Sequence, residues 1–203
     1  LNLCVSGAAA IDAKISQFFD DIGIDFFAGY GLTETSPVVA ACNYHLNIFG
    51  SVGNPTADIE VAIDTDSNEP GAIGEILTRS ESVMLGYYKN PEATAEVMTA
   101  DGWFRTGDIG FLDKKGCIHI TGRLKSMIVL ANGKKAFPEE IEFLVNRIPG
   151  VKESLVWGDV SARDGGVDIC AKLVLSPDDL GADVLADEKA LFKLISDQIK
   201  QVN

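Results

Sequence analysis

Residues 1–28 read LNLCVSGAAAIDAKISQFFDDIGIDFFA, and this stretch decides the fold class. Residues 1–5 form an apolar run that predicts a buried strand, and a turn of small residues follows it. Over residues 11–22 apolar side chains recur at the spacing of one helix face, and Gly23 is typical of a helix end. Residues 25–28 predict a second strand. Two strands joined through a helix favour parallel pairing, so we expect the end of a parallel sheet in an α/β subdomain.

The next segment, GYGLTETSP at residues 29–37, reads as a loop after that second strand. The carboxyl end of such a strand is where open α/β sheets bind ligands. The ring of Tyr30 can stack on a nucleobase, and the hydroxyl of Thr33 can donate to a phosphate. The carboxylate of Glu34 suits Mg²⁺, which prefers oxygen ligands. On composition alone, a glycine-rich turn with polar surface side chains is the favoured explanation of the segment.

Two later segments also carry groups that suit a nucleotide. In DGWFRTGDIG, residues 101–110, an ionised Asp108 can accept two hydrogen bonds from a ribose diol. The alternative is an aspartate that caps a turn before a strand. In TGRLKSMIVL, residues 121–130, Arg123 presents a fork of donors for ribose or phosphate oxygens. The alternative there is a pair of surface charges where a strand begins.

The middle of the chain predicts a small, β-rich, barrel-like subdomain. Turn-forming residues separate short apolar runs, and Asn90-Pro91 is typical of a helix start. The strands expected there are 59–63, 73–78, 109–112 and 117–121. Beyond Gly122 the pattern changes to a small α+β unit, so we expect a domain boundary near residues 123–125. Its expected elements are a hairpin over 127–137, a helix from Pro138, strands at 151–157 and 167–175, and a helix from about 187.

Composition restricts the class of partner. The 203 residues include 30 acidic and 17 basic side chains, and the net charge is −13, which argues against binding nucleic acid or anionic lipid. The four cysteines are too far apart for a zinc knuckle or a CxxC redox pair, which is typical of reduced thiols in a cytosolic protein. We therefore expect a cytoplasmic location. His45 and His119 are isolated, and we expect a structural or surface role for each.

Several segments together resemble the core motifs of the adenylate-forming, AMP-binding superfamily. They are YGLTE at 30–34, WFRTGD at 103–108 and GRLK at 122–125, in that order. The intervening residues 50–55, 84–94 and 132–142 match as well, and the resemblance runs from about Ser6 to Trp157. That superfamily includes acyl-CoA synthetases, non-ribosomal adenylation domains and beetle luciferases. NGKK at 132–135, with PEE at 138–140, makes the chain most similar to long-chain fatty acyl-CoA synthetases.

The resemblance implies a domain division and a reaction. Residues 1–124 correspond to the C-terminal part of the large AMP-binding domain, with an α/β piece at 1–49 and the β-rich subdomain at 50–124. Residues 125–203 correspond to an incomplete C-terminal lid domain. The implied reaction converts a fatty acid and ATP to an acyl-adenylate, with Mg²⁺ bound, and then transfers the acyl group to CoA.

The resemblance also implies roles for individual residues. It implies that Gly7, Ala8 and Ala9 form the turn that lines the adenine and acyl pocket. It implies that Tyr30 stacks on adenine, that Gly31 lets the nucleotide approach, and that Asp108 and Arg123 bind the ribose. Thr33 is the implied phosphate contact, and Glu34 is the implied Mg²⁺ ligand. Those implied for the lid are Lys125 as the hinge residue and Gly133 in the loop that faces the CoA thiol. We expect Thr33, Glu34 and Lys125 to matter for catalysis.

The sequence also departs from the family. The phosphate loop ending in Pro-Lys-Gly and the late catalytic lysine are absent, so we expect an interior piece that does not complete adenylation by itself. Arg79-Ser80 stands where Arg-Gly is usual. The alternatives are an adenylation domain that loads a carrier protein, a luciferase-type oxidase and a non-catalytic nucleotide-binding module. The expected partners are ATP, CoA and the acid, and peripheral membrane association of the parent stays open.

Overall fold

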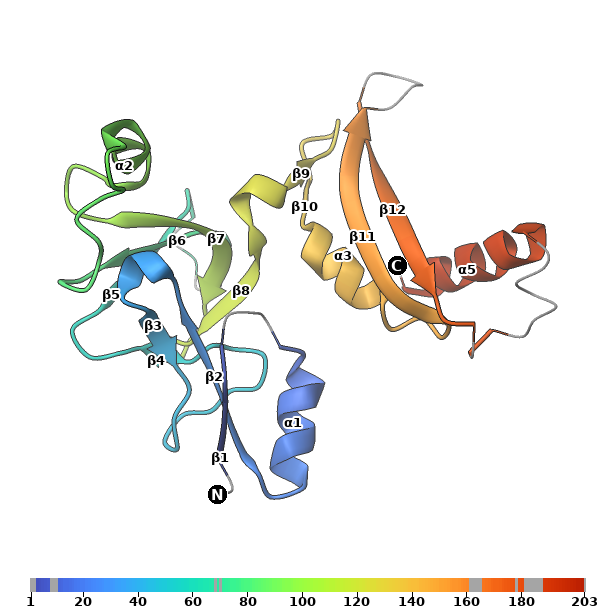
Figure 1. Cartoon of the computed structure of the whole chain (residues 1–203), viewed down its shortest axis with the longest axis horizontal. Coiled ribbons are helices and arrows are strands. Elements are labelled where there is room, and N and C mark those ends of the chain that lie inside the picture. Colours follow the sequence, from blue (N-terminus) through green and yellow to red (C-terminus); the bar gives the residue numbers. More distant parts are fainter. Residues whose placement is uncertain are drawn as a thin grey trace. The chain divides into compact units, whose positions relative to one another are not determined.

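The structure is a computed structural model that describes residues 3–7, 11–67, 69, 71–160, 166–177, 179–180 and 188–202. Contacts between Cα atoms divide the chain into two compact units, Leu1–Leu124 and Lys125–Asn203. Figure 1 draws both units, and each is described here by itself. None of the described helices is both long and apolar enough to cross a membrane.

The first sheet of the N-terminal unit has the order β1-β2-β3-β4. Its strands are β1 Leu3–Ser6, β2 Asp25–Gly31, β3 Val38–Ala41 and β4 Asn54–Pro55. Helix α1, Ala13–Asp21, connects β1 to β2, and these two strands pair in parallel, as the strand–helix–strand pattern predicted. The remaining pairs, β2 with β3 and β3 with β4, are antiparallel, so the sheet is mixed.

Local chemistry explains where α1 begins and ends. The side chain of Asp12 caps the helix by accepting a hydrogen bond from the backbone N–H of Lys14 at 2.9 Å. Gly23 has a φ of +76°, which glycine adopts at little cost beyond the last helical turn. Phe19 stacks on Phe26 of β2 with ring centroids 5.1 Å apart, and this contact fixes the helix against the sheet.

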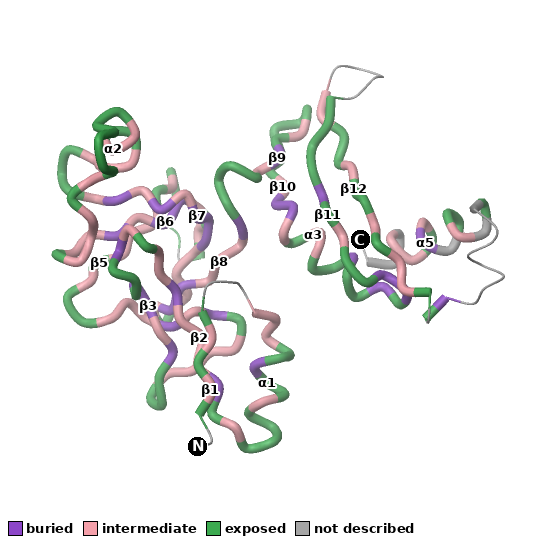
Figure 2. Tube along the Cα trace, viewed as in Figure 1, coloured by how far each residue is buried: buried purple, intermediate pink, exposed green. Residues whose placement is uncertain are grey.

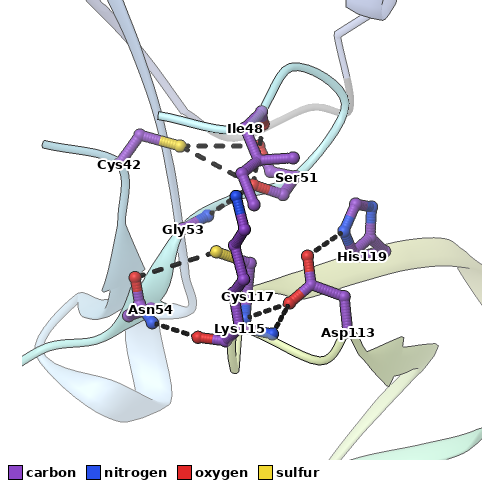
Figure 3. Close-up of polar contacts among 9 residues, drawn as sticks. All are labelled: Cys42, Ile48, Ser51, Gly53, Asn54, Asp113, Lys115, Cys117 and His119. Atoms are coloured by element: carbon purple, nitrogen blue, oxygen red, sulfur yellow. Dashed lines mark hydrogen bonds and ion pairs between the residues drawn. The ribbon is translucent and has the colours of Figure 1, made fainter. Parts of the chain in front are cut away.

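The second sheet is antiparallel with the order β5-β6-β7-β8. Its strands are β5 Glu60–Asp64, β6 Gly74–Arg79, β7 Phe104–Leu112 and β8 Ile118–Arg123, and helix α2, Pro91–Val97, lies between β6 and β7 in sequence. The side chain of Asn90 caps α2, as its sequence predicted. Backbone hydrogen bonds of 2.9 Å from Val52 to Ile118 and from Ile118 to Gly53 join β8 to the segment that leads into β4 of the first sheet. Figure 3 shows the polar side chains around this junction.

Two sequence predictions about these sheets were wrong in extent. Gly29, Tyr30 and Gly31 were predicted as a loop, but they are the last residues of β2 because they pair with β3. Strand β7 begins at Phe104 rather than at residue 109, so Asp108 lies inside a strand and does not cap a turn before one. The shared core of both sheets contains Tyr30, Val39, Ala40, Ile76 and Ile118. Figure 2 colours buried residues purple along the Cα trace.

The C-terminal unit is α+β, as predicted. A short hairpin, β9 Ile128–Val129 with β10 Lys135–Ala136, precedes helix α3, Pro138–Val145. A long hairpin of β11 Val151–Val160 and β12 Val167–Leu175 follows, and then helix α5, Glu188–Val202. Its core joins α3, β11 and α5 through Val145, Ile148, Val151 and Ile195.

Candidate nucleotide site

The centre of the candidate site is a buried carboxylate, that of Asp108 in β7. The hydroxyl of Tyr30, near the end of β2, donates a hydrogen bond of 2.6 Å to its Oδ2 atom. Arg123, at the end of β8 and directly opposite Asp108 in the strand register, donates from its guanidinium to Oδ1 at 2.7 Å. Tyr30 and Asp108 are only 8% and 4% exposed. The fold therefore brings Tyr30 and Arg123, from two of the sequence motifs, onto the carboxylate of Asp108 from the third.

The electrostatics of this contact define the protonation state of the tyrosine. Burial of Tyr30, and next the negative charge of Asp108, raise the pKa of the phenol far above its usual range. The phenol is therefore a neutral donor at physiological pH, and the carboxylate is the acceptor. Because most of Tyr30 lies in the core, only a small exposed part of it is available for the predicted stacking on adenine.

Two side chains that the sequence analysis did not single out hold the backbone around Asp108. The hydroxyl of Thr106 donates to the carbonyl of Ile76 at 2.7 Å and accepts from the N–H of Asp108 at 3.1 Å. Glu75 on β6, only 7% exposed, accepts from the N–H of Gly107 at 3.0 Å. Thr106 lies inside the WFRTGD segment, which is a usable signal, whereas nothing in the sequence around Glu75 marks its role.

The 3-10 turn Thr33–Thr35 presents the second group of polar side chains. The hydroxyl of Thr35, 1% exposed, accepts from the N–H of Leu32 at 3.0 Å and lies 2.9 Å from the carbonyl oxygens of Leu32 and Pro37. A Cβ atom on Gly31 would lie 1.6 Å from the carbonyl oxygen of Pro37, so the chain itself requires glycine there. The turn leaves Thr33 exposed and Glu34 half-buried.

Glu34 has a partner that the sequence did not reveal. The hydroxyl of Tyr87 donates to Oε1 of Glu34 at 3.0 Å, and the N–H of Met84 donates to the Glu34 carbonyl at 2.8 Å. Burial, and next the hydrogen bond to Glu34, raise the pKa of Tyr87. Tyr87 lies in the segment 84–94 that the sequence analysis quoted only for its resemblance, and its contact with Glu34 spans 53 positions.

The remaining predicted residues are in different places. Gly7 follows β1, and a Cβ atom there would lie 3.6 Å from the carbonyl oxygen of Gly29, close to the end of β2. Ala8 and Ala9 lie outside the described residues. Lys125 and Gly133 belong to the C-terminal unit, Lys125 in the 3-10 turn Leu124–Ser126 and Gly133, with a φ of +78°, in the turn between β9 and β10.

The donor set around Glu34 limits what kind of cation could bind. Within the described part of the chain, no group of three or more histidine, cysteine, aspartate or glutamate side chains could hold a metal ion. A cation at Glu34 would therefore take most of its ligands from water and a bound substrate. Mg²⁺ commonly binds in this way, through one or two carboxylates and substrate phosphates, so Glu34 fits that ion.

Comparisons with known proteins also relate this chain to enzymes that bind AMP. The family described as AMP-binding enzyme matches residues 1–88. A chloroplastic long-chain-fatty-acid–[acyl-carrier-protein] ligase of Arabidopsis thaliana is 38% identical over 177 residues, which cover 80% of this chain and 24% of that protein. A long-chain-fatty-acid–CoA ligase, FadD15 of Mycobacterium tuberculosis, is 37% identical over 163 residues, which cover 80% of this chain and 26% of that protein.

A solved structure agrees with the sequence comparisons. It is the o-succinylbenzoate–CoA synthetase of Bacillus subtilis in complex with ATP and magnesium ion. Its TM-score is 0.77 at 26% identity, and the match covers 89% of this chain and 40% of that one. The chain thus spans about a quarter of the two curated relatives, and the likeness to the solved structure extends over both units.

Proposed function

Because this chain belongs to the adenylate-forming, AMP-binding superfamily, we propose that it supplies much of the nucleotide site of an ATP-dependent acid–CoA ligase for long-chain fatty acids. The observation that carries the proposal is the convergence of Tyr30 and Arg123 on the buried carboxylate of Asp108. Two ligases for long-chain fatty acids among the relatives support the substrate class.

Asp108 is the proposed ligand for the ribose hydroxyls. An ionised carboxylate has about four lone-pair positions, and Tyr30 and Arg123 occupy one on each oxygen. The remaining positions can accept hydrogen bonds from the ribose diol. Arg123, whose side chain is 56% exposed, keeps further N–H groups that can donate to the nucleotide.

Thr33 and Glu34 are the proposed contacts for the phosphates and for Mg²⁺. The exposed hydroxyl of Thr33 can donate to a phosphate oxygen, and Glu34 offers a carboxylate oxygen to the cation. Mg²⁺, when bound, neutralises charge on the phosphates as pyrophosphate leaves. In the first half-reaction an oxygen of the fatty acid carboxylate bonds to the α-phosphorus of ATP, the bond from that phosphorus to the bridging oxygen breaks, and pyrophosphate departs.

The second half-reaction is proposed to depend on the C-terminal unit. The CoA sulfur bonds to the acyl carbon, and AMP leaves with the electron pair of the broken carbon–oxygen bond. Lys125, the first residue of that unit, is the proposed hinge, and Gly133 the proposed contact near the CoA thiol. Domain rotation between two half-reactions is an established way for one site to carry out both.

The experiment that tests this function uses the full-length protein with ATP, Mg²⁺, CoA and acids from acetate to palmitate. We expect acid-dependent pyrophosphate release and acyl-CoA formation, both highest with long acids. Glu34→Ala removes the proposed ligand itself and should lower the rate by about 100-fold or more, since loss of an outer-shell partner already costs about 10- to 100-fold. The chain of residues 1–203 alone should release no pyrophosphate. If no acid stimulates the full-length protein, the proposal is wrong.

A second candidate acceptor is an acyl carrier protein in place of CoA. One relative is named for that acceptor, which is the reason to consider it. The same assay distinguishes the two acceptors when each is supplied alone, with mass spectrometry of the thioester product. Acyl transfer to the carrier protein with none to CoA would favour this alternative and keep the adenylation step unchanged.

A further inference from the structure

The loop before α2 is held in one place by hydrogen bonds at both of its ends. At its start the N–H of Met84 donates to the carbonyl of Glu34 at 2.8 Å. At its end the N–H of Tyr87 donates to the hydroxyl of Thr94 in α2 at 2.9 Å, and the N–H of Asn90 donates to the carbonyl of Tyr87 at 3.1 Å. The backbone of Tyr87 is therefore fixed between the Glu34 turn and helix α2.

Gly86 shows how closely this loop approaches the helix. Its φ is +148°, and a Cβ atom there would lie 2.8 Å from the Cγ2 atom of Thr94. The hydroxyl of Thr94 also donates to the carbonyl of Asn90 at 2.9 Å, which orients it to accept from Tyr87. Gly86, Thr94 and the capped start of α2 thus together fix the position of Tyr87.

This arrangement places the side chain of Tyr87 in contact with Glu34. The Tyr87 hydroxyl donates to Oε1 at 3.0 Å, and within the described part of the chain Oε2 accepts no hydrogen bond. A free glutamate side chain at the surface samples several rotamers, and ordering it on ligand binding costs conformational entropy. A hydrogen bond that selects one rotamer beforehand removes part of that cost.

We propose that Tyr87 is a positioning residue that orients Glu34 for the Mg²⁺ of the bound nucleotide. This inference rests on the proposed function. Groups that hydrogen-bond to a metal ligand typically change metal affinity by about 10- to 100-fold when removed. Since Tyr87 is 36% exposed, the lower end of that range applies. The bond makes only a small contribution to folding stability for the same reason.

The test compares Tyr87→Phe with Tyr88→Phe in the full-length protein. Tyr88 is the next residue, 86% exposed, and its ring contacts Lys89 rather than Glu34. The first readout is binding of Mn²⁺ in the presence of ATP, followed by electron paramagnetic resonance. We expect about tenfold weaker Mn²⁺ binding for Tyr87→Phe, no change for Tyr88→Phe, and similar melting temperatures for both.

A second variant and a second readout separate positioning from general damage. Thr94→Val removes the acceptor of the Tyr87 N–H and should weaken Mn²⁺ binding in the same direction by a smaller factor. In steady-state assays Tyr87→Phe should raise the Mg²⁺ concentration needed for half-maximal rate while the KM for the fatty acid stays unchanged. In a Glu34→Gln background Tyr87→Phe should have no further effect on Mn²⁺ binding.

The outcomes are distinct for the inference and for the proposed function. The positioning role is wrong if the wild-type protein activates fatty acids and Tyr87→Phe binds Mn²⁺ at least as tightly as wild type does. Tighter binding by the variant would mean that the hydroxyl competes with the cation. A wild-type protein that binds Mn²⁺–ATP but activates no acid would overturn the proposed function, and the binding comparison would still decide the role of Tyr87.

Discussion

The hydroxyl of Tyr30 lies 2.6 Å from Oδ2 of Asp108, a residue 78 positions later in the chain. This contact joins the first sheet of the N-terminal unit to the second, since Tyr30 is on β2 and Asp108 on β7. Hydrogen bonds to a charged acceptor are about twice as strong as neutral ones. The contact therefore stabilises the unit and also orients a carboxylate proposed to bind ribose.

Removing that hydroxyl should destabilise the N-terminal unit. Tyr30→Phe leaves a buried carboxylate oxygen without its donor, and we expect a loss of about 1–3 kcal/mol. The matched control is Tyr44→Phe, because Tyr44 also donates to a carboxylate, at 3.2 Å to Asp25, but is 70% exposed. That variant should lose clearly less stability than Tyr30→Phe, because polar contacts exposed to solvent contribute little.

Urea unfolding followed by tryptophan fluorescence measures this difference. The two tryptophans lie in different units, so Trp157→Phe in every variant leaves Trp103 as the reporter of the N-terminal unit. Equal losses for Tyr30→Phe and Tyr44→Phe would contradict the structural account of the Tyr30 contact.

Stability at alkaline pH should depend on the same tyrosine. The pKa of Tyr30 is raised in the folded state, so its contribution is complete below the unfolded pKa of about 10 and is lost as pH rises through the folded value. We expect the free energy of unfolding to fall more steeply above about pH 10 in wild type than in Tyr30→Phe. The same urea assay at several alkaline pH values measures this difference. If the free energy of unfolding falls equally with pH in both proteins, Tyr30 is not the group responsible.

Two glycines in β2 provide a test of the turn geometry. Gly31→Ala would place its Cβ atom 1.6 Å from the Pro37 carbonyl oxygen, whereas Gly29→Ala would meet the Ala40 carbonyl oxygen at an ordinary 3.5 Å. We expect Gly31→Ala to lose more than about 3 kcal/mol and Gly29→Ala to change stability by about 1 kcal/mol or less. The Trp103 assay compares them directly, and a tolerated Gly31→Ala would show that the turn can rearrange.

Stability in acid should depend on Asp113, which lies in the β7–β8 turn (Figure 3). Its Oδ1 atom accepts the N–H groups of Lys115 and Cys117 at 2.8 and 2.9 Å, and Oδ2 lies 3.2 Å from His119. Burial raises the pKa of Asp113, but the hydrogen bonds from Cys117, His119 and Lys115 outweigh it, so the pKa is lower than usual.

This lowered pKa determines how the free energy of unfolding changes with pH. The contribution of Asp113 is complete above the unfolded pKa of about 3.9 and is lost as pH falls through the folded value. Asp113→Asn keeps an acceptor for the two N–H groups but has no titrating charge. We expect its free energy of unfolding to fall less than that of wild type when pH drops from about 5 to about 3. An identical acid dependence in both proteins would exclude this role for Asp113.

Local sequence patterns predicted the elements that local chemistry defines. Helix α1 has an apolar face and the Asp12 cap, α2 begins at Asn90-Pro91, and β12 runs over the residues that were expected. Strands β3 and β4 were not predicted. They are short, and β4 has only the two residues Asn54 and Pro55. Their existence depends on pairing with strands that other parts of the chain supply, which periodicity does not reveal.

The sequence motifs named candidate residues for one site but did not predict the contacts between them. The motifs indicated that Tyr30, Asp108 and Arg123 belong together, yet the sequence gives no sign that the Tyr30 ring is buried and bonded to Asp108. The Tyr87–Glu34 contact joins positions 53 apart across a loop, so only the folded arrangement reveals it. The role of Glu75 is also hidden in the sequence, because its carboxylate accepts a hydrogen bond from the backbone of Gly107 on a neighbouring strand.

The most direct measurement of the central claim is the affinity of the full-length protein for ATP and for 2′,3′-dideoxy-ATP, with Asp108→Asn beside wild type and Asp113→Asn as the control. We expect wild type and Asp113→Asn to prefer ATP by about tenfold or more, which corresponds to one charge-assisted hydrogen bond. Asp108→Asn should lose most of that preference while far-ultraviolet circular dichroism shows that it is folded. An unchanged preference in a folded Asp108→Asn protein would contradict the assignment of this carboxylate to the ribose.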